Sequence, residues 1–151
     1  RKPNIINSLY LKPDELERTV VERFKRYDVI KENEVRVEEY LTEDAEYIVV
    51  AYGATARVVR SAVESARAQG IKAGLIRPIT LWPFPEKTIA NAAKRVKSML
   101  TVEMSMGQMV EDVRLAVNGM CGVSFFGRTG GIVPTPAEVL HEICKLAGGA
   151  E

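Results

Sequence analysis

"EYIVVAYGATARVVRSAVESARAQG", residues 46–70, is the stretch that decides the fold. Its first part is a compact run of β-branched and aromatic residues, a pattern typical of a strand buried on both faces. After Gly53, apolar residues recur at helical spacing from Val59 to Ala66, and Gly70 ends the helix. A buried strand that passes through a glycine into an amphipathic helix predicts a parallel sheet covered by helices.

The same alternation continues along the chain. Further strands are expected at residues 71–78, 98–105 and 123–127, and residues 35–41 read as a strand or an extended lead-in. Further helices are expected at residues 86–96, about 106–118 and 136–148. Two capping boxes open the last two helices, Ser105 with Gln108 and Thr135 with Glu138. We therefore expect an α/β fold of three layers, α/β/α, with a mainly parallel sheet of about five strands.

A charged region precedes this alternation. Pro13 suits a first helical turn, and from Leu16 to Tyr27 apolar residues recur in one narrow helical stripe. We expect residues 1–34 to form a helical connector that packs on the α/β domain of residues 35–151. The chain begins with arginine rather than methionine, which we interpret as the mark of a piece of a longer polypeptide.

The composition argues against several classes of function. A formal net charge of +1, with acidic and basic residues intermixed, offers no basic patch for nucleic acid or an acidic membrane surface. No apolar run approaches the roughly 20 residues of a membrane span. Two cysteines are too few for a disulfide framework or an iron–sulfur cluster. We expect a cytoplasmic protein without a nucleic-acid or membrane partner.

The sequence contains no complete catalytic or metal site. Gly53 stands where a phosphate-binding turn could lie, but Thr55 and Val58 replace the later glycines of the dinucleotide fingerprint. A tight strand-to-helix turn is the favoured interpretation. His141 and Cys144 can share a helical face, but a zinc site needs more ligands. We therefore assign no catalytic residue and no metal ligand.

The connection "RPITLWPFPE", residues 77–86, is apolar and stiff where a loop is usually polar. Its prolines restrict the backbone, so that the aromatic side chains can be presented at a small cost in entropy. We expect Trp82 to be half-buried and Phe84 to point inward. The connection either caps its own sheet edge or docks onto a neighbouring domain, and docking is favoured.

Two further loops carry residues that could contribute to a binding site or an interface. Glu103 ends a buried strand, where it could pair with Arg77 or Arg114, or face a partner's site. The five methionines all fall between residues 99 and 120 and suit either core packing or an interface. Arg128, among glycines, could hold a phosphate or carboxylate, or could be solvated.

These features follow four predicted strands and gather at one edge of the sheet, as expected of a surface that meets another domain. The interface candidates are Gly53, Arg77, Trp82, Phe84, Glu103, Met106, Gln108 and Arg128. Arg128 is also the one candidate for a cofactor contact.

The same segments carry a family resemblance. "VAYGATARVVRSAVESARAQGIKAGLIRPITLWPFP", "VEMSMGQMVEDVRLAV" and "FFGRTGG" resemble the alpha subunit of 2-oxoacid:ferredoxin oxidoreductases of the 2-oxoisovalerate or 2-oxoglutarate type. Within that subunit they are similar to the C-terminal domain, which is like the C-terminal domain of transketolase. The resemblance covers roughly residues 46–147, and residues 7–18 look like the connector before this domain.

The resemblance implies a parent complex that decarboxylates a 2-oxoacid to acyl-CoA and reduces ferredoxin. It implies thiamine diphosphate with magnesium, iron–sulfur clusters and coenzyme A in that complex, none of them bound by this domain alone. It also implies partners: the remaining alpha-subunit domains, the beta and gamma or delta subunits, and ferredoxin indirectly. This chain lacks the "GDG" diphosphate motif and a cysteine-rich cluster motif, so alone it is expected to be inactive.

Two alternatives stay open at this point. One is the C-terminal domain of another thiamine enzyme, either transketolase or the beta chain of a 2-oxoacid dehydrogenase. The other is a flavodoxin-like module that binds a ligand or a protein without catalysis.

Overall fold

The structure is a computed structural model that describes residues 8–148. The chain divides into two compact units, Arg1–Glu34 and Val35–Glu151. In the first unit, helix α1 (Pro13–Asn33) opens with proline and two acidic residues, which suit the positive end of a helix. None of its residues is buried, and the rings of Phe24 and Tyr27 lie 5.6 Å apart. This helix therefore presents its apolar stripe on its surface.

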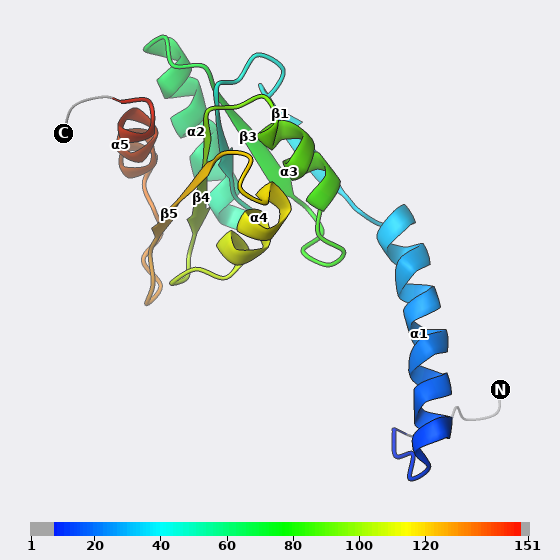
Figure 1. The fold of residues 1–151 in the computed structure, drawn as a ribbon. Coiled ribbons are helices and arrows are strands. Elements are labelled where there is room, and N and C mark those ends of the chain that lie inside the picture. The colour runs from blue at the N-terminus through cyan, green and yellow to red at the C-terminus, as the bar shows by residue number, and fades with distance from the viewer. Residues whose placement is uncertain (1–7, 149–151) are drawn as a thin grey trace, which may run out of the picture. The chain divides into compact units, whose positions relative to one another are not determined.

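The second unit is a five-stranded sheet with helices on both faces (Figure 1). Its strands are β1 (Val37–Tyr40), β2 (Tyr47–Val50), β3 (Ala73–Pro78), β4 (Ser98–Glu103) and β5 (Gly122–Gly127). Its helices are α2 (Gly53–Ala68), α3 (Glu86–Ala93), α4 (Met109–Val117) and α5 (Pro136–Leu146). The strand order is β1-β3-β2-β4-β5, and only β1 runs antiparallel to its neighbour. The expected three-layer fold with a mainly parallel sheet is confirmed.

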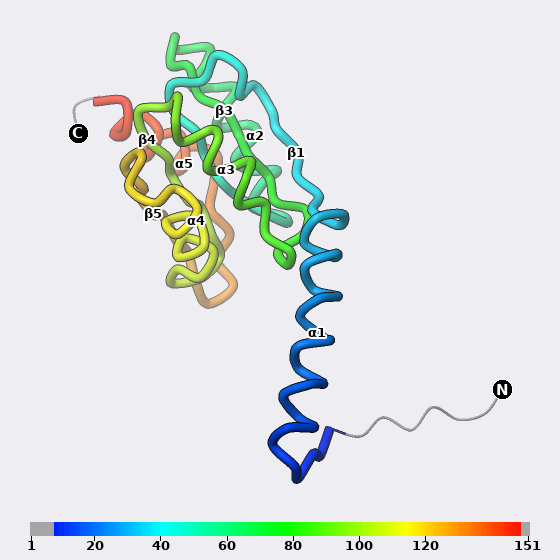
Figure 2. The backbone as a smooth tube through the Cα atoms, turned by 45° about the vertical axis from the view of Figure 1, so that its right-hand side comes forward, coloured from blue at the N-terminus to red at the C-terminus, as the bar shows by residue number. Residues whose placement is uncertain are grey.

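Two apolar cores flank the sheet, because the central strands are apolar on both faces. Helices α2 and α5 cover one face, where Val49, Leu75 and Ile143 are buried. Helices α3 and α4 cover the other face, over Ile48 and Met99. Figure 2 shows the tube of α3 and α4 on this second face. Full burial of each such side chain stabilises the fold by about 1.5–3 kcal/mol.

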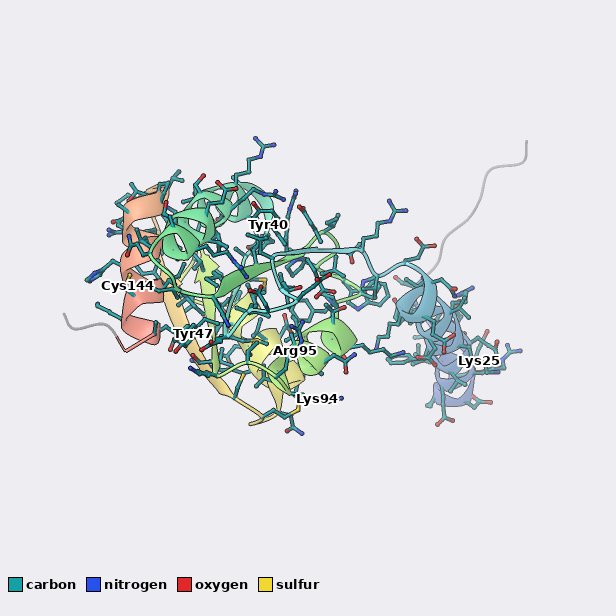
Figure 3. The ribbon with its side chains drawn as sticks, turned by 90° about the horizontal axis from the view of Figure 1, so that it is seen from above. Lys25, Tyr40, Tyr47, Lys94, Arg95 and Cys144 are labelled. Atoms are coloured by element: carbon teal, nitrogen blue, oxygen red, sulfur yellow. The ribbon has the colours of Figure 1, made fainter. Side chains whose placement is uncertain are left out.

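Strand β1 is held at the sheet edge by side chains on both faces. On one face, the Tyr40 hydroxyl donates to Glu64 of α2 at 2.9 Å, and the Arg60 guanidinium lies 4.0 Å from the centre of the Tyr40 ring. On the other face, Arg95 (Figure 3), which follows α3, lies 3.9 Å from the Glu39 carboxylate of β1 and donates to the carbonyl of Thr42, just beyond the strand. The lead-in expected at residues 35–41 is thus a true strand.

One expected helix start is wrong. The Ser105–Gln108 pair predicts a helix from Met106, but α4 begins at Met109 and has no side-chain cap from Gln108. The Ser105 hydroxyl instead accepts from the Gly107 N–H and donates to Glu103, because that carboxylate takes over the cap. The second capping box, Thr135 with Glu138, is confirmed at the start of α5.

Candidate functional site

Four loops meet at the carboxyl edge of the parallel strands. They follow β2, β3, β4 and β5 and span residues 51–52, 79–85, 104–108 and 128–135. Parallel strands end at a common edge, and in open α/β sheets this edge is where sites form. The register of the sheet therefore brings together the loops that the sequence predicted to lie at one edge.

This edge is apolar. Of the ten large apolar side chains that the second unit exposes within the described residues, seven lie in these loops. They are Ile79, Leu81, Trp82, Met104, Met106, Ile132 and Val133. A folded protein scatters single exposed apolar residues over its surface, but a concentration in adjoining loops marks an interaction surface. We call these seven side chains the apolar edge.

The loop after β3 is braced from within. The Ile79 N–H donates to the Arg36 carbonyl at 2.9 Å, and the Thr80 hydroxyl donates to the Pro83 carbonyl at 3.0 Å. Phe84 packs against the α3–α4 core, whereas Trp82 remains 54% exposed. The inward position of Phe84 is confirmed, and about half of the Trp82 surface is available to a partner.

Glu103 is a cap and not a surface residue. Its carboxylate is fully buried and accepts from the main-chain N–H groups of Gln108, Met109 and Val110, at 3.2, 3.0 and 2.9 Å. The expected pairings of Glu103 with Arg77 or Arg114 are wrong, because this carboxylate accepts hydrogen bonds from the start of α4 instead. The N-terminus of a helix at this edge is where a phosphate binds in doubly wound folds. At α4 that position is filled by the chain's own side chain.

The methionines divide between core and surface. Met99 and Met109 are buried in the α3–α4 core. Met104 and Met106 lie in the loop that Glu103 holds, and Met106 is 84% exposed. Methionine adapts to irregular partner surfaces at little cost in rotamer strain. Core packing is therefore confirmed for Met99 and Met109, and an interface stays a prediction for the exposed methionines.

Both candidate arginines are engaged within the chain. Arg77 donates to Glu38 of β1 at 3.0 Å, and Glu38 also pairs with Arg60 of α2. Arg128 pairs with Glu138 of α5, and its guanidinium lies 5.8 Å from the centre of the Phe126 ring. These arginines brace the sheet edge and the loop after β5.

Gly53 forms the tight turn into α2 in the left-handed region, with φ of 57°.

The sequence analysis missed part of the apolar edge, namely Ile79, Leu81, Ile132 and Val133. A large apolar residue beside a proline in a loop is a signal that could have found two of them, Ile79 after Pro78 and Val133 before Pro134. Such loops cannot bury these side chains against their own strand.

The described part of the chain contains no candidate metal site. Across residues 8–148, no group of three or more His, Cys, Asp and Glu side chains is arranged to hold a metal ion. The chain has two cysteines, both free thiols, and an iron–sulfur cluster generally takes four. In the same range, no helix combines the length and apolar character needed to cross a bilayer.

Residues 45–139 match the family of pyruvate:ferredoxin oxidoreductase core domain II. The chain belongs to this family. It is 46% identical over 145 residues to ketoisovalerate oxidoreductase subunit VorB of Methanothermobacter marburgensis, covering 96% of this chain and 41% of that protein. It is 43% identical over 110 residues to 2-oxoglutarate synthase subunit KorA of Methanothermobacter thermautotrophicus, covering 73% of this chain and 29% of that protein. The family resemblance predicted from the sequence is confirmed.

Solved structures give the same fold for this core domain II. One is the 2-oxoglutarate:ferredoxin oxidoreductase of Magnetococcus marinus, solved with 2-oxoglutarate, coenzyme A and succinyl-CoA bound. It matches with a TM-score of 0.78 at 22% identity, over 90% of this chain and 24% of that chain. A split-gene transketolase, described as an inactive beta4 tetramer, matches with a TM-score of 0.62 at 19% identity, over 73% of this chain and 40% of that chain. The transketolase-like fold is thus confirmed.

Proposed function

We propose that this chain is the C-terminal structural and assembly domain of the alpha subunit of a 2-oxoacid:ferredoxin oxidoreductase. The observation that carries the proposal is the apolar edge, which offers side chains for docking where a catalytic domain would offer reacting groups. The family match and the relatives named as oxidoreductase subunits support the same assignment. The chain spans about two-fifths of the length of the first of these relatives, so the rest of the subunit belongs to the proposal.

The parent complex would convert a 2-oxoacid to acyl-CoA and pass two electrons to ferredoxin. Thiamine diphosphate with magnesium supplies the carbanion chemistry, and iron–sulfur clusters supply the electron path. The described residues of this chain include no group of three side chains that could hold a metal ion, and we assign no step of the reaction to them. Their role is to fix the position of neighbouring domains. We place the complex in the cytoplasm, where free thiols such as Cys121 and Cys144 persist.

The partners follow from the same proposal. The apolar edge would dock onto the remaining domains of the alpha subunit or onto the beta subunit, with gamma or delta subunits and ferredoxin further away. Residues 1–34 would be the helical connector, and the apolar stripe of α1 suits packing against a neighbouring domain. For the substrate we propose 2-oxoisovalerate, since the relative named for ketoisovalerate matches over 96% of the chain and the relative named for 2-oxoglutarate over 73%.

Substitutions at the apolar edge test the proposal. Met106→Glu and Trp82→Ala, made in the complete alpha subunit, should weaken its assembly with the other subunits by at least about tenfold. Both variants should unfold at the wild-type temperature, since both side chains are more than half exposed. The matched control is Leu115→Glu, a 75% exposed apolar residue of α4 outside the four loops.

Size-exclusion chromatography and turnover of 2-oxoisovalerate and 2-oxoglutarate give the readouts. Full assembly and turnover with Met106→Glu would show that the apolar edge is not an interface. Unfolding of Trp82→Ala would return the loop after β3 to the core of this domain. Faster turnover of 2-oxoglutarate by the wild-type complex would overturn the substrate assignment.

A further inference from the structure

A small pocket opens at the switch point of the sheet. The chain leaves β2 toward β3 on one side and leaves β4 toward β5 on the other, so a crevice lies between the ends of β2 and β4. A pocket of about 190 Å³ lies there, lined by Tyr52, Leu81, Phe84, Gln108, Met109 and Asp112. Because known ligand pockets span about 300–1,000 Å³, this one has the size of a single side chain and not of a cofactor.

The pocket combines apolar walls with one carboxylate. Leu81, Phe84 and Met109 supply aliphatic and aromatic surface, and Tyr52 packs against the same core. Asp112 lies in the first turn of α4 and is exposed. Among the described residues its carboxylate has no hydrogen-bond or ion-pair partner, whereas its neighbour Glu111 pairs with Arg114 at 2.9 Å. The pocket therefore has a carboxylate that no cationic side chain of residues 8–148 pairs with.

We propose that this pocket receives one lysine or arginine side chain from the polypeptide that docks on the apolar edge. The aliphatic stem of such a side chain would lie against Leu81, Phe84 and Met109, and its cationic end would pair with Asp112. The proposal rests on the proposed function, because it names the chemistry of the partner at that same surface.

Charge complementarity selects this occupant over the alternatives. A purely apolar side chain would leave the Asp112 carboxylate beside a dry partner without a counter-charge, which is costly. An acidic side chain or a phosphate would be repelled by Asp112. The apolar edge continues the same surface through Leu81, which belongs to both. The cationic side chain would thus set the register of an interface whose area comes from the apolar edge.

Assembly of the complete complex tests the cation. Asp112→Asn should weaken assembly by on the order of tenfold and Asp112→Lys by more, because each leaves a buried cation without its partner. Glu111→Gln, one residue earlier on the same helix, is the matched control and should change assembly less than about twofold. Both side chains are exposed, so thermal unfolding of the chain should be unaffected by any of the three variants.

A direct titration tests the pocket without any partner. Chemical shifts of the wild-type chain at Tyr52, Leu81 and Met109 should move on addition of n-butylguanidinium chloride. n-Butanol of the same chain length, or the Asp112→Asn chain, should give binding weaker by about threefold or more.

The outcomes separate the two proposals. If Met106→Glu prevents assembly and Asp112→Lys does not, the apolar edge docks without a cation and the inference is overturned, while the proposed function stands. If neither variant changes assembly, the proposed function fails. Equal shifts for butanol and butylguanidinium would overturn the inference whichever way assembly behaves.

Discussion

The Glu103 carboxylate accepts the main-chain N–H of Val110 at 2.9 Å, seven residues along the chain. It accepts from Gln108 and Met109 as well, so one buried side chain satisfies three donors at the start of α4. These donors have no partner within the helix. The bonds also fix the loop of residues 104–108, so that Met106 stands out from the surface while Met109 enters the core.

Replacement of this carboxylate should destabilise the domain. Glu103→Ala leaves buried N–H donors unpaired at about 1–3 kcal/mol each, so a loss of about 3 kcal/mol in the free energy of unfolding is expected. Glu103→Gln should lose somewhat less, since one oxygen remains as an acceptor. Urea unfolding of the chain measures both. Glu111→Gln on the same helix is the control, and wild-type stability for Glu103→Ala would contradict the capping role.

Gly127 allows the loop after β4 to lie close to β5. A methyl group at this glycine would come within 2.4 Å of the Ser105 carbonyl oxygen and 2.5 Å of the Phe125 ring. Gly127→Ala should therefore cost about 1–3 kcal/mol through displaced backbone. Gly122→Ala in the same strand is the matched control, because its methyl group would meet only the Ser98 Cβ, at 3.8 Å. Equal unfolding temperatures of the two variants would show that the loop after β4 can move away from β5 without a cost in stability.

The fold was predictable because its signals are local. Apolar runs such as residues 47–50 mark buried strands. The cap of α5 forms between Thr135 and Glu138, which are only three residues apart. The Ser105–Gln108 prediction failed because a side chain outside the four-residue motif, Glu103, competes for the same donors. The pocket beside Asp112 was out of reach altogether, since three separate segments of the chain supply its walls.

Low pH should weaken the interaction of Asp44 with Arg67, which lies at the amino ends of the parallel strands. Hydrogen bonding to Arg67 holds the pKa of the Asp44 carboxyl below its usual value. The same guanidinium donates to the carbonyls of Leu41 and Ala73, at 2.7 and 2.6 Å. The folded state binds the proton less tightly than the unfolded state. The stabilisation is therefore present above the unfolded pKa of about 3.9 and is lost as the pH falls through the lower folded pKa.

Asp44→Asn should accordingly unfold at a lower temperature than the wild type at pH 7. The gap should close as the pH falls from about 4 through the lower folded pKa of Asp44, because the wild-type carboxyl then becomes neutral too. Thermal unfolding followed by circular dichroism between pH 7 and pH 2 measures the gap. Glu43→Gln serves as the neighbouring control, and a gap that stays constant with pH would rule out the Asp44–Arg67 contribution.

Arg128 should matter for the loop after β5 and not for coenzyme A. Its guanidinium pairs with one carboxylate oxygen of Glu138. The other oxygen of Glu138 accepts from the Thr135 N–H at 2.8 Å, so the ion pair ties Arg128 to the start of α5. Arg128→Ala should lower the stability of the chain by up to about 1 kcal/mol, the range of a partly exposed pair. In the assembled complex, KM for coenzyme A and for the 2-oxoacid should stay within about twofold of the wild type, the spread left by a residue that contacts neither. A tenfold rise in KM for coenzyme A, with assembly intact and Arg128→Lys restoring part of it, would instead assign Arg128 a direct contact with that ligand.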